Sequence, residues 1–422
     1  MINVLIFPAG TEIGREIYLS LRNEKNINLV LAGADYDSHA RHYACEYHVV
    51  PDVTHHDGLP VLQALLVQES IDYIFPAHDD ALLFLSENRK ALSATVLCPS
   101  QETCRITRFK SKTYQALKGA VPLPAVFNDP SAIAQWPVFV KPDRGQGAQG
   151  ALRVDSPERL ASILAERNDL IICEYLNGEE FTVDCFSDRA QGLLFCQPRI
   201  RSRIRAGIAM TSTLVSLPEV DAYARAISQK LQLYGAWFFQ LKRSASGTLT
   251  LLEVAPRIAG TMALNRVAGI NFAMLTLYES MRVNINILPT INDIQITRSL
   301  SNRYQHRIKF KHVYIDYDDT IVNNGKLCLL VITFLYQCIN NGIKLHLITR
   351  HAGNIHSSLR EMRLDNVFDT ITHLGQKDKK SIYITERNAI FIDDSFRERL
   401  DVFSHTQIPT FDINQIEMLI DS

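Results

Sequence analysis

The segment Val138-Phe-Val-Lys-Pro-Asp-Arg-Gly-Gln-Gly-Ala-Gln-Gly150 joins an apolar run to a glycine-rich loop. The apolar run ends in Lys141, and the loop carries Gly145, Gly147 and Gly150. Glycines let a backbone approach phosphate oxygens closely, and successive backbone N–H groups in such a loop form a concave anion site. The loop is not a P-loop, because no Gly-Lys-Ser/Thr closes it and it leads into a predicted strand rather than a helix. The segment predicts nucleotide binding, with an ordinary glycine-rich hairpin as the alternative.

Further patterns along the chain favour the nucleotide interpretation. The apolar, strand-like run 170–173 is followed directly by Glu174-Tyr-Leu-Asn-Gly-Glu-Glu-Phe-Thr-Val-Asp184. Later, 238–240 and 251–257 are predicted to lie in two strands joined by a Ser-Ala-Ser-Gly turn. Oxygen-bearing side chains on two adjacent antiparallel strands can be aimed at one point, as a Mg²⁺ site requires.

These ordered motifs, spread over residues 1–300, resemble the ATP-grasp superfamily, in particular the carbamoyl-phosphate-synthase-like branch of carboxylate–amine ligases. The resemblance implies a multidomain protein of the α/β and α+β classes. A Rossmann-like pre-ATP-grasp domain is expected at 1–107, and an ATP-grasp domain at 108–300 with a lid at about 112–178. It also implies ATP and Mg²⁺ as cofactors, with Mn²⁺ as an alternative ion.

The resemblance assigns a nucleotide role to individual residues. Lys112 and Lys141 would bind phosphates, with a solvated surface charge as the alternative for Lys112. Glu174 would accept a hydrogen bond from the adenine amino group, and Glu180 would bind the ribose hydroxyls, unless both belong to a solvated hairpin. The residues implied to bind nucleotide are Lys112, Lys141, Gly145, Gly147, Gly150, Glu174, Tyr175, Leu176 and Glu180.

The same resemblance makes Gln240 and Glu253 the magnesium ligands of this domain. It makes Arg257 the group that neutralises the transferring phosphoryl group. Family members commonly read Glu-x-Asn-Pro-Arg here, and the Asn is a further metal ligand. This chain has Ala255 instead. Alanine cannot coordinate a metal, so either a water fills that position or a second metal is held weakly.

Four arginines recur with period two, at 199, 201, 203 and 205. On a strand this spacing places four guanidinium groups on one face, which is unfavourable unless anions lie opposite. We expect contact with the γ-phosphate or a substrate carboxylate, with Arg205 best placed because it precedes Gly207. A solvated loop is the alternative.

The first hundred residues alternate between strand and helix patterns, which predicts a doubly wound parallel sheet. The predicted strands are 2–7, 29–33 and 72–76. Gly10 and Gly14 give only an incomplete dinucleotide fingerprint, so we do not expect a dinucleotide there. His78 and Asp79 follow the end of a strand, where α/β sites occur. We expect them to cap a helix rather than contact substrate.

A second α/β pattern follows the polar, basic segment 301–311, which we interpret as a linker. Val313-Tyr-Ile-Asp-Tyr-Asp-Asp-Thr320 is an apolar run ending in three carboxylates and a threonine. Like charges this close are unfavourable unless a cation is bound. Thr349 ends a second apolar run, and Asp393 and Asp394 end a third, after a lysine cluster.

These motifs resemble the haloacid dehalogenase (HAD) superfamily and imply a Rossmannoid HAD-like hydrolase domain over 312–422. By this resemblance Asp316 is the nucleophile that forms an aspartyl-phosphate, and Asp318 is the general acid and base. Thr349 and a lysine would hold the transferring phosphoryl group. The candidates for that lysine are Lys377, Lys379 and Lys380, of which Lys380 fits best. The implied magnesium site consists of Asp316, Asp318, Asp393 and Asp394.

Only 33 positions separate Asp316 from Thr349, which leaves no room for a large cap domain. An open site of this kind suits a large substrate, or one handed over by another domain. The alternative is a decayed fold that is kept for its structure alone.

The composition is that of a globular protein: 422 residues, 46% hydrophobic and 21% charged, enough for two to four domains. The net charge of −1 favours neither nucleic acid nor an anionic membrane as a partner. Eight cysteines without a CxxC pair indicate a reducing cytoplasm and no structural zinc. The start of the chain reads as a strand rather than a signal peptide. The most apolar run, 327–339, is too short to span a bilayer and predicts a buried helix.

The sequence therefore predicts a bifunctional cytoplasmic enzyme. The first part would join a small-molecule carboxylate to an amine through an acyl phosphate, and the second would hydrolyse the phosphate ester of a metabolite. One alternative is a HAD phosphatase with a non-catalytic nucleotide-binding module, motivated by Ala255. Another is an ATP-grasp kinase that stops at phosphoryl transfer. The resemblance implies that a homodimer is the usual assembly.

Overall fold

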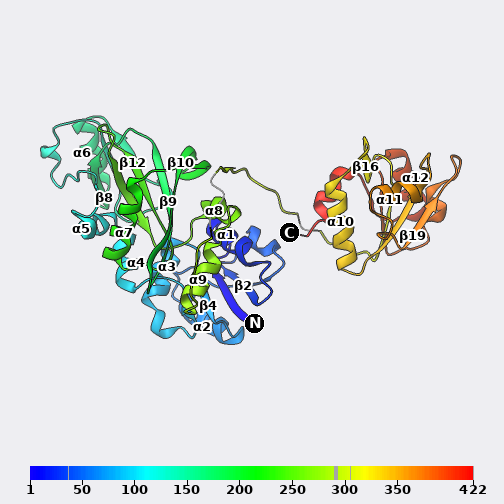
Figure 1. The fold of residues 1–422 in the computed structure, drawn as a ribbon, viewed down its shortest axis with the longest axis horizontal. Coiled ribbons are helices and arrows are strands. Elements are labelled where there is room, and N and C mark those ends of the chain that lie inside the picture. Colours follow the sequence, from blue (N-terminus) through cyan, green and yellow to red (C-terminus); the bar gives the residue numbers. More distant parts are fainter. Residues whose placement is uncertain (37, 289–292, 305, 422) are drawn as a thin grey trace. The chain divides into compact units, whose positions relative to one another are not determined.

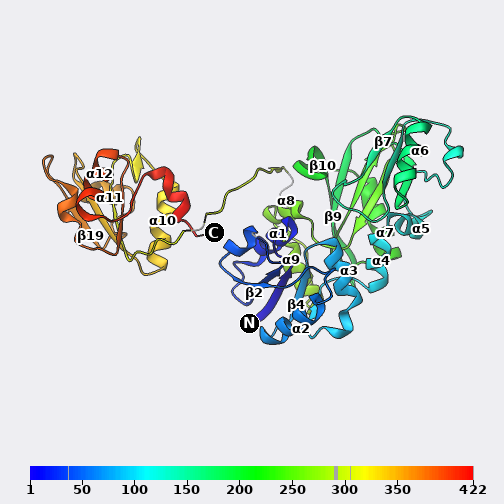
Figure 2. The ribbon, with the colours of Figure 1, turned by 180° about the vertical axis from the view of Figure 1, so that it is seen from behind.

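The structure is a computed structural model, and it describes residues 1–36, 38–288, 293–304 and 306–421. The chain divides into two compact units. The first consists of residues 1–41 and 45–300, and the second of residues 301–422 with 42–44. Figures 1 and 2 show the first unit in blue to green and the second in yellow to red.

A five-stranded parallel sheet opens the first unit, as the alternating pattern predicted. Its strand order is β3 (Glu46–Val49), β2 (Ile27–Gly33), β1 (Ile2–Phe7), β4 (Tyr73–Pro76), β5 (Thr95–Val96). Its helices are α1 (Glu12–Leu21), α2 (Gly58–Gln68), α3 (Asp79–Glu87) and α4 (Gln101–Arg108). Leu5 and Ile74 in the central strands have no exposed surface. This is typical of a parallel sheet covered on both faces.

A three-stranded antiparallel sheet carries the glycine-rich segment. Its order is β7 (Leu152–Val154), β6 (Val138–Pro142), β8 (Leu170–Glu174), and the helices beside it in sequence are α5 (Lys110–Leu117) and α6 (Pro157–Glu166). The Ser156 hydroxyl accepts from the Arg159 backbone N–H, and Pro157 follows it, so α6 begins with favourable N-cap and N1 residues. Apolar side chains of β6, β8 and α6 form a small core of their own.

The largest sheet is antiparallel and has six strands. Its order is β13 (Leu249–Ala255), β12 (Gly235–Arg243), β9 (Glu180–Asp188), β10 (Gly192–Arg205), β11 (Ile208–Leu214), β14 (Gln295–Thr297). The odd-numbered residues of β9 and β12, such as Val183 and Phe239, pack with α7 (Glu219–Leu231) in one core. Because side chains alternate along a strand, the even-numbered residues point to the opposite face. That face carries Thr182, Asp184, Phe238 and Gln240.

The last part of the first unit returns to the first sheet. The helices α8 (Ala263–Val267) and α9 (Phe272–Ser280) follow β13 in the chain, and Figures 1 and 2 show α9 beside α1. Arg266 forms an ion pair with the buried Glu16 of α1 (2.7 Å), and Asn271 Nδ2 donates to the Ser20 carbonyl (2.7 Å). These helices, which we assigned to the ATP-grasp domain, therefore tie that domain to the Rossmann-like one.

The second unit contains a parallel sheet of order β19 (Thr370–His373), β18 (Lys344–Thr349), β15 (His312–Ile315), β20 (Ala389–Ile392), β21 (Thr410–Phe411). Its helices are α10 (Leu329–Asn340), α11 (Ile355–Glu361) and α12 (Phe396–Thr406). Between β15 and β18 the chain forms a short hairpin, β16 (Val322–Asn323) and β17 (Lys326–Leu327), and then α10. No cap domain is inserted in this fully described stretch. The expected linker has neither helix nor strand in its described residues, 301–304 and 306–311.

The prediction of a buried helix at 327–339 is only partly right. Val331, Phe334 and Cys338 are buried in the core of the second unit. Leu329 is 75% exposed on the same helix, and Tyr336 and Ile339 are also exposed. The helix α10 therefore covers the sheet with one face and meets solvent with the other, although its sequence is apolar on both.

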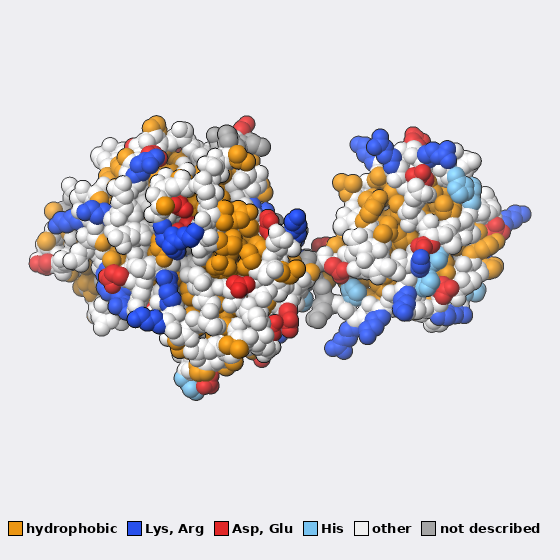
Figure 3. Space-filling view, turned by 60° about the horizontal axis from the view of Figure 1, so that its bottom comes forward, with side chains coloured by type: hydrophobic (Ala, Val, Ile, Leu, Met, Phe, Trp, Pro, Cys, Tyr) orange, Lys and Arg blue, Asp and Glu red, His pale blue; other side chains and the backbone are white. Residues whose placement is uncertain are grey.

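Charged side chains of both signs are interspersed on the face of the molecule shown in Figure 3. This distribution agrees with the near-zero net charge. None of the described helices has the length and apolar character needed to cross a membrane. All eight cysteines are free, and five of them are buried.

One ion pair lies completely inside the six-stranded sheet. Arg199 of β10 donates to both carboxylate oxygens of Asp184 on β9 (2.8 and 3.1 Å), and Asn265 Nδ2 donates to the same carboxylate (2.8 Å). The two charged side chains are 1% and 0% exposed. Removing one charge of such a pair leaves the other buried without compensation.

We expect Asp184→Asn to lower the free energy of unfolding of the first unit by about 3–5 kcal/mol. The control is Asp221→Asn, which breaks the exposed pair between Asp221 and Arg225 and should cost about 0.3–0.5 kcal/mol. Denaturant unfolding followed by tryptophan fluorescence measures both, because Trp136 and Trp237, the two tryptophans, lie in the first unit. Equal effects of the two substitutions would contradict this prediction.

Candidate functional site

Three adjoining cavities run through the first unit, with volumes of about 310, 210 and 80 Å³. The two larger cavities share Lys110, Gly145, Gly147 and Gln240 among their lining residues. The middle and smallest cavities share Phe139, Lys141, Glu180 and Leu252. The shared walls make one continuous site, and its total volume is in the range of small-molecule sites.

The smallest cavity contains most of the residues expected at the adenine. Glu174 and Leu176 line it, together with Phe139 and Leu252, whose apolar groups suit the faces of a planar base. Tyr175 does not line any of the three cavities. Its ring lies beside Phe139 (6.4 Å between centroids) and under the Arg153 guanidinium (5.1 Å), so its side chain supports the wall from outside.

Lys141 lies where the smallest and middle cavities meet. Its side chain is buried, and Nζ donates to the Tyr114 hydroxyl (2.8 Å), which donates in turn to the Leu252 carbonyl (2.8 Å). Burial lowers the pKa of Lys141, because the charged form loses hydration. An anion beside Nζ would favour the charged form again, so the position suits a phosphate.

The structure favours Lys110 over Lys112 as the second candidate, besides Lys141, for a phosphate-binding lysine. Lys112 is exposed and lines none of the three cavities; its Nζ lies 4.7 Å above the Phe109 ring. Lys110 lines the two larger cavities, and its Nζ donates to the Gly145 carbonyl (3.3 Å). The helical periodicity of the sequence could have indicated that Lys110, rather than Lys112, faces the interior. Thr113, Tyr114 and Leu117 form the buried face of α5, and Lys110 lies three, four and seven positions before them.

The glycine-rich loop borders the site through two of its three glycines. Gly145 and Gly147 line the two larger cavities. Gly150 does not, and its φ of +69° places it in a turn beside Pro142 and Arg167. A side chain on Gly207 would overlap the backbone of Gly147, so the loop contacts the turn between β10 and β11.

Gln240 and Glu253, the predicted magnesium ligands, face each other across β12 and β13 in direct register. Both line the two larger cavities. Gln240 Oε1 accepts from Arg201 Nη1 (2.9 Å), and Arg201 also forms an ion pair with Glu180. Ala255 lines the largest cavity, so the position of the family's asparagine faces the site but offers a methyl group. The two oxygen-bearing side chains fit one Mg²⁺ that completes its shell with phosphate oxygens and water.

The expectation for Arg205 is not supported by its position. Arg199 and Arg201 line the largest cavity, whereas Arg205 is exposed and lines none of the three. The pairing of β10 with β11 is irregular between Arg201 and Ile204. A bulge of this kind breaks the alternation of side chains, so the period of two places only the first two arginines at the site.

The first turn of α3 closes the end of the largest cavity. Asp79 accepts two hydrogen bonds from Arg257 (2.6 and 2.7 Å), although the two residues are 178 positions apart. Burial alone would raise the pKa of Asp79, but the Arg257 guanidinium outweighs it and holds that pKa below its usual value. His78 caps the helix as expected, since its Nδ1 accepts from the Asp80 backbone N–H (3.2 Å). The amide group of Gln146 in the glycine-rich loop hydrogen-bonds to His78 Nε2 (2.6 Å).

A second site lies at the carboxyl ends of the strands of the second unit. Asp316 follows β15, Thr349 ends β18, and Asp393 and Asp394 follow β20. Oxygens of Asp316, Asp393 and Asp394 lie within 4.8 Å of one another. The geometry selects Lys380 from the lysine cluster, because its Nζ lies 2.7 Å from both Asp316 Oδ1 and Asp393 Oδ2.

Asp318 is placed apart from that carboxylate cluster. Its two carboxylate oxygens lie 3.0 Å from His351 Nδ1, and His351 Nε2 hydrogen-bonds to Ser358 of α11. The Asp318 side chain is half exposed, which suits a group that exchanges protons with substrate and water. Its carboxylate is therefore not brought to the expected metal position. His351 is a site residue that no motif in the sequence identified.

The charges of this second site perturb one another strongly. Burial, and then the nearby Asp316 carboxylate, raise the pKa of Asp393 to about 6 against the opposing effect of Lys380. Burial also raises the pKa of Asp316. The pKa of Lys380 is raised, because the two carboxylates outweigh the effect of its own burial. Three carboxylate ligands with oxygen donors and a surplus of negative charge fit a divalent cation such as Mg²⁺.

Comparisons with known proteins bear on the first unit. The family described as "ATP-grasp in the biosynthetic pathway with Ter operon" matches residues 166–300, and the "PylC-like, N-terminal domain" family matches residues 4–97. No curated protein matches the sequence.

Several solved structures share the fold. The biotin carboxylase domain of 2-oxoglutarate carboxylase from Hydrogenobacter thermophilus, solved with MgADP, ADP and bicarbonate, is 17% identical, with a TM-score of 0.59 over 68% of this chain and 70% of that one. L-amino acid ligase from Bacillus licheniformis is 18% identical (TM-score 0.55, 67% and 74% covered). N5-carboxyaminoimidazole synthetase from Staphylococcus aureus, solved with ADP, is 15% identical (TM-score 0.56, 67% and 78% covered). These similarities show that the first unit has the ATP-grasp fold.

We expect the Mg²⁺ affinity of the second site to depend on pH through Asp393. A carboxylate must be ionised to bind a cation, so protonation below about pH 6 should weaken binding by up to about tenfold per pH unit. Affinity should rise from pH 5 to pH 7 and level off above. Calorimetric titration of the nucleotide-free protein with Mg²⁺ at several pH values measures this.

Asp393→Asn should remove most of that binding, whereas Asp365→Asn, which changes an exposed carboxylate of the same unit, should leave the whole profile unchanged. A wild-type affinity that stays constant between pH 5 and pH 7 would contradict the prediction.

Proposed function

We propose that the first unit is an ATP-dependent ligase that joins a carboxylate to an amine through an acyl phosphate. One observation carries this proposal. The three adjoining cavities unite a slot for a planar base, two lysines, a pair of magnesium-ligand side chains and an arginine in that order. This order of residues matches the order in which the adenine, the phosphates, the metal ion and the acceptor substrate would lie when ATP and the acceptor are bound end to end.

The residues can be assigned to steps. Lys141 and Lys110 would hold the phosphates of ATP, and the backbone of Gly145 and Gly147 would cover them. Gln240 and Glu253 would hold Mg²⁺, which supplies positive charge to the phosphate oxygens. The substrate carboxylate then attacks the γ-phosphorus in line and ADP leaves. Arg257 lines the largest cavity, where it can neutralise charge on the transferring group.

The second half-reaction forms the amide. The amine attacks the carbonyl carbon of the acyl phosphate, the C–O bond to phosphate breaks, and inorganic phosphate leaves with the electron pair. The largest cavity, of about 310 Å³, has room for the acceptors beside Arg257 and the first turn of α3. L-amino acid ligase from Bacillus licheniformis, whose name states the ligation of amino acids, shares the fold. The biotin carboxylase structure is described as a dimer, and we propose a homodimer here too.

Ala255 supports two narrower alternatives. A site with one metal position fewer could bind nucleotide without turnover, or could stop after phosphoryl transfer and act as a kinase. The intact positions of Lys141, Glu253 and Arg257 favour turnover, and an amide product detected by mass spectrometry would exclude the kinase. Formation of ADP without any condensed product would favour it.

The test of the ligase is ADP formation with Mg-ATP and pools of amino acids and small carboxylic acids, run in an Asp316→Asn background to silence the second unit. We expect substrate-dependent ADP. Lys141→Met should lower the rate about 10- to 100-fold, because charged hydrogen bonds contribute about 1.5–3 kcal/mol.

Lys112→Met is the matched control, since it removes a lysine of α5 that lies outside the cavities, and it should change the rate less than about twofold. If no pool elicits ADP while nucleotide still binds, the ligase proposal fails in favour of a nucleotide sensor.

For the second unit we propose hydrolysis of a phosphate monoester. The observation that favours it is the position of Lys380 between Asp316 and Asp393. Lys380 would neutralise the phosphoryl oxygens while Asp316 attacks phosphorus and the alkoxide leaves with a proton from Asp318. Water activated by Asp318 then cleaves the aspartyl-phosphate. Asp316, Asp393 and Asp394 would hold Mg²⁺. The stretch between β15 and β18 adds no cap, so the site suits a phosphorylated metabolite of variable size.

We expect Asp316→Asn to lower hydrolysis of p-nitrophenyl phosphate at least about a thousandfold, as loss of a nucleophile does in other enzymes. Asp319→Asn is the control. Asp319 is exposed in the same loop with a φ of +55°, which asparagine adopts readily, so activity should stay within about twofold of wild type. Release of phosphate at an unchanged rate by Asp316→Asn would rule out this mechanism.

A further inference from the structure

Three metal-ligand side chains meet at the edge of the first sheet, outside the cavities described above. Glu46 and His48 lie two positions apart on β3, so their side chains share one face of this edge strand. Glu69 comes from the C-terminal end of α2. Oxygens of the two glutamates and a ring nitrogen of His48 all lie within 4.8 Å of one another.

The separations fit ligands around a metal ion better than they fit hydrogen bonds. His48 Nε2 lies 3.5 Å from Glu46 Oε1 and 3.7 Å from Glu69 Oε1. An N–H donor usually lies about 2.7–3.2 Å from its acceptor. Ligands bonded to tetrahedral zinc at about 2.0–2.2 Å are about 3.3–3.6 Å apart, close to the two separations seen here.

The surroundings of His48 also point to a ligand. Its side chain is 17% exposed, and Nε2 is buried without a hydrogen-bond partner among the described residues. A buried nitrogen without a partner is costly, and here it lies between two carboxylates. Gln68 Nε2 donates to Glu69 Oε1 (2.8 Å), the oxygen nearest to His48, and so fixes that carboxylate. Groups that orient ligands in this way are typical of metal sites.

We propose that Glu46, His48 and Glu69 bind one Zn²⁺ ion. One imidazole nitrogen and two carboxylate oxygens are ligands that zinc accepts, and water would fill the fourth position. The ion would join the edge strand β3 to the end of α2. It would also compensate the negative charges of the two carboxylates. We expected no structural zinc because the cysteines lack metal-binding spacing, but this site needs none of them.

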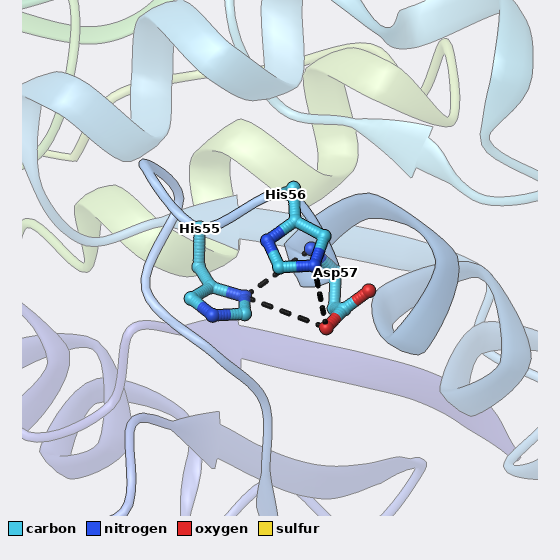
Figure 4. A group of neighbouring side chains, drawn as sticks. All are labelled: His55, His56 and Asp57. Carbon is cyan, nitrogen blue, oxygen red and sulfur yellow. Dashed lines mark hydrogen bonds and ion pairs between the residues drawn. The ribbon is translucent and has the colours of Figure 1, made fainter.

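A second group of possible metal ligands lies nearby in the chain and serves as an internal control for zinc binding. His55, His56 and Asp57 are consecutive residues before α2, and Figure 4 shows both imidazole rings beside the Asp57 carboxylate. The two histidine side chains are 51% and 82% exposed. His55 Nδ1 already accepts from the Asp57 backbone N–H (3.2 Å), so that nitrogen is occupied. We expect this cluster to bind zinc only weakly.

The experiment measures zinc binding to the full chain after removal of metals, in competition with a chromophoric chelator. Millimolar Mg²⁺ is present throughout to occupy the carboxylates of the other two sites. Wild type should bind one Zn²⁺ tightly. His48→Gln and Glu69→Gln should each weaken this binding at least tenfold, whereas the double variant His55→Ala/His56→Ala should retain it. Zinc should also raise the midpoint of thermal unfolding of wild type and of the double variant, but not of His48→Gln.

Two substitutions at different elements keep the test decisive if one of them impairs folding, which circular dichroism would reveal. Unchanged zinc affinity in both His48→Gln and Glu69→Gln would overturn the proposal. Loss of tight binding only in the double variant would overturn it too, and would assign the zinc to the exposed histidines.

Discussion

The ion pairs at the first turn of α3 hold the site of the first unit together. Asp79 binds Arg257, which follows β13 of the six-stranded sheet, and Asp80 binds Arg108 at the end of α4 (2.9 Å). Asp80 also binds Arg144 of the glycine-rich loop. Burial alone would raise the pKa of both carboxyl groups, but the arginine partners outweigh it and hold the pKa values of Asp79 and Asp80 below their usual range. The first turn of α3 in the Rossmann-like domain thus holds the guanidinium groups of three arginines, which come from three other segments of the chain.

In the proposed reaction, this arrangement would connect the acceptor side of the site to its phosphate side. Arg257 is largely buried, and Asp79 satisfies its guanidinium with two hydrogen bonds, so its direction is set by a residue of the first sheet's helices. The helices α8 and α9 hold these two parts together, through contacts with α1 such as Arg266 with Glu16 and Asn271 with Ser20. A group that must meet developing charge works best when it is held in place before the reaction. The fold therefore preorganises Arg257 through contacts distant in sequence.

Local patterns in the sequence predicted most of the strands and the residues that follow directly from them. The family resemblance named Lys141, Gln240 and Glu253, and all three line the cavities, although the pairing of β12 with β13 is irregular just after Gln240. Lys112 lies outside the cavities because two positions along a helix turn a side chain to the opposite side, and Lys110 takes the inward place. Arg205 lies outside them because a bulge interrupts β10. The pair of Asp79 with Arg257 spans 178 positions, and no local pattern predicts it.

The three sites differ in the balance of their charged side chains, and this balance agrees with the different ligands that we propose for them. In the first unit Arg257, Arg201 and Arg108 each pair with a carboxylate, and Lys110 and Lys141 line the same group of cavities and would add positive charge for an anionic ligand. In the second unit Lys380 pairs with Asp316 and Asp393, and Asp394 lies close to both carboxylates, so this cluster has more negative than positive charge, as the proposed cation site needs. At the edge of the first sheet, Glu46 and Glu69 lie 3.5 and 3.7 Å from His48 Nε2, so two carboxylates approach one imidazole. Because uncompensated like charges at such distances are unfavourable, both carboxylate clusters favour the divalent ions that we propose, and the lysines favour the phosphates of the proposed nucleotide.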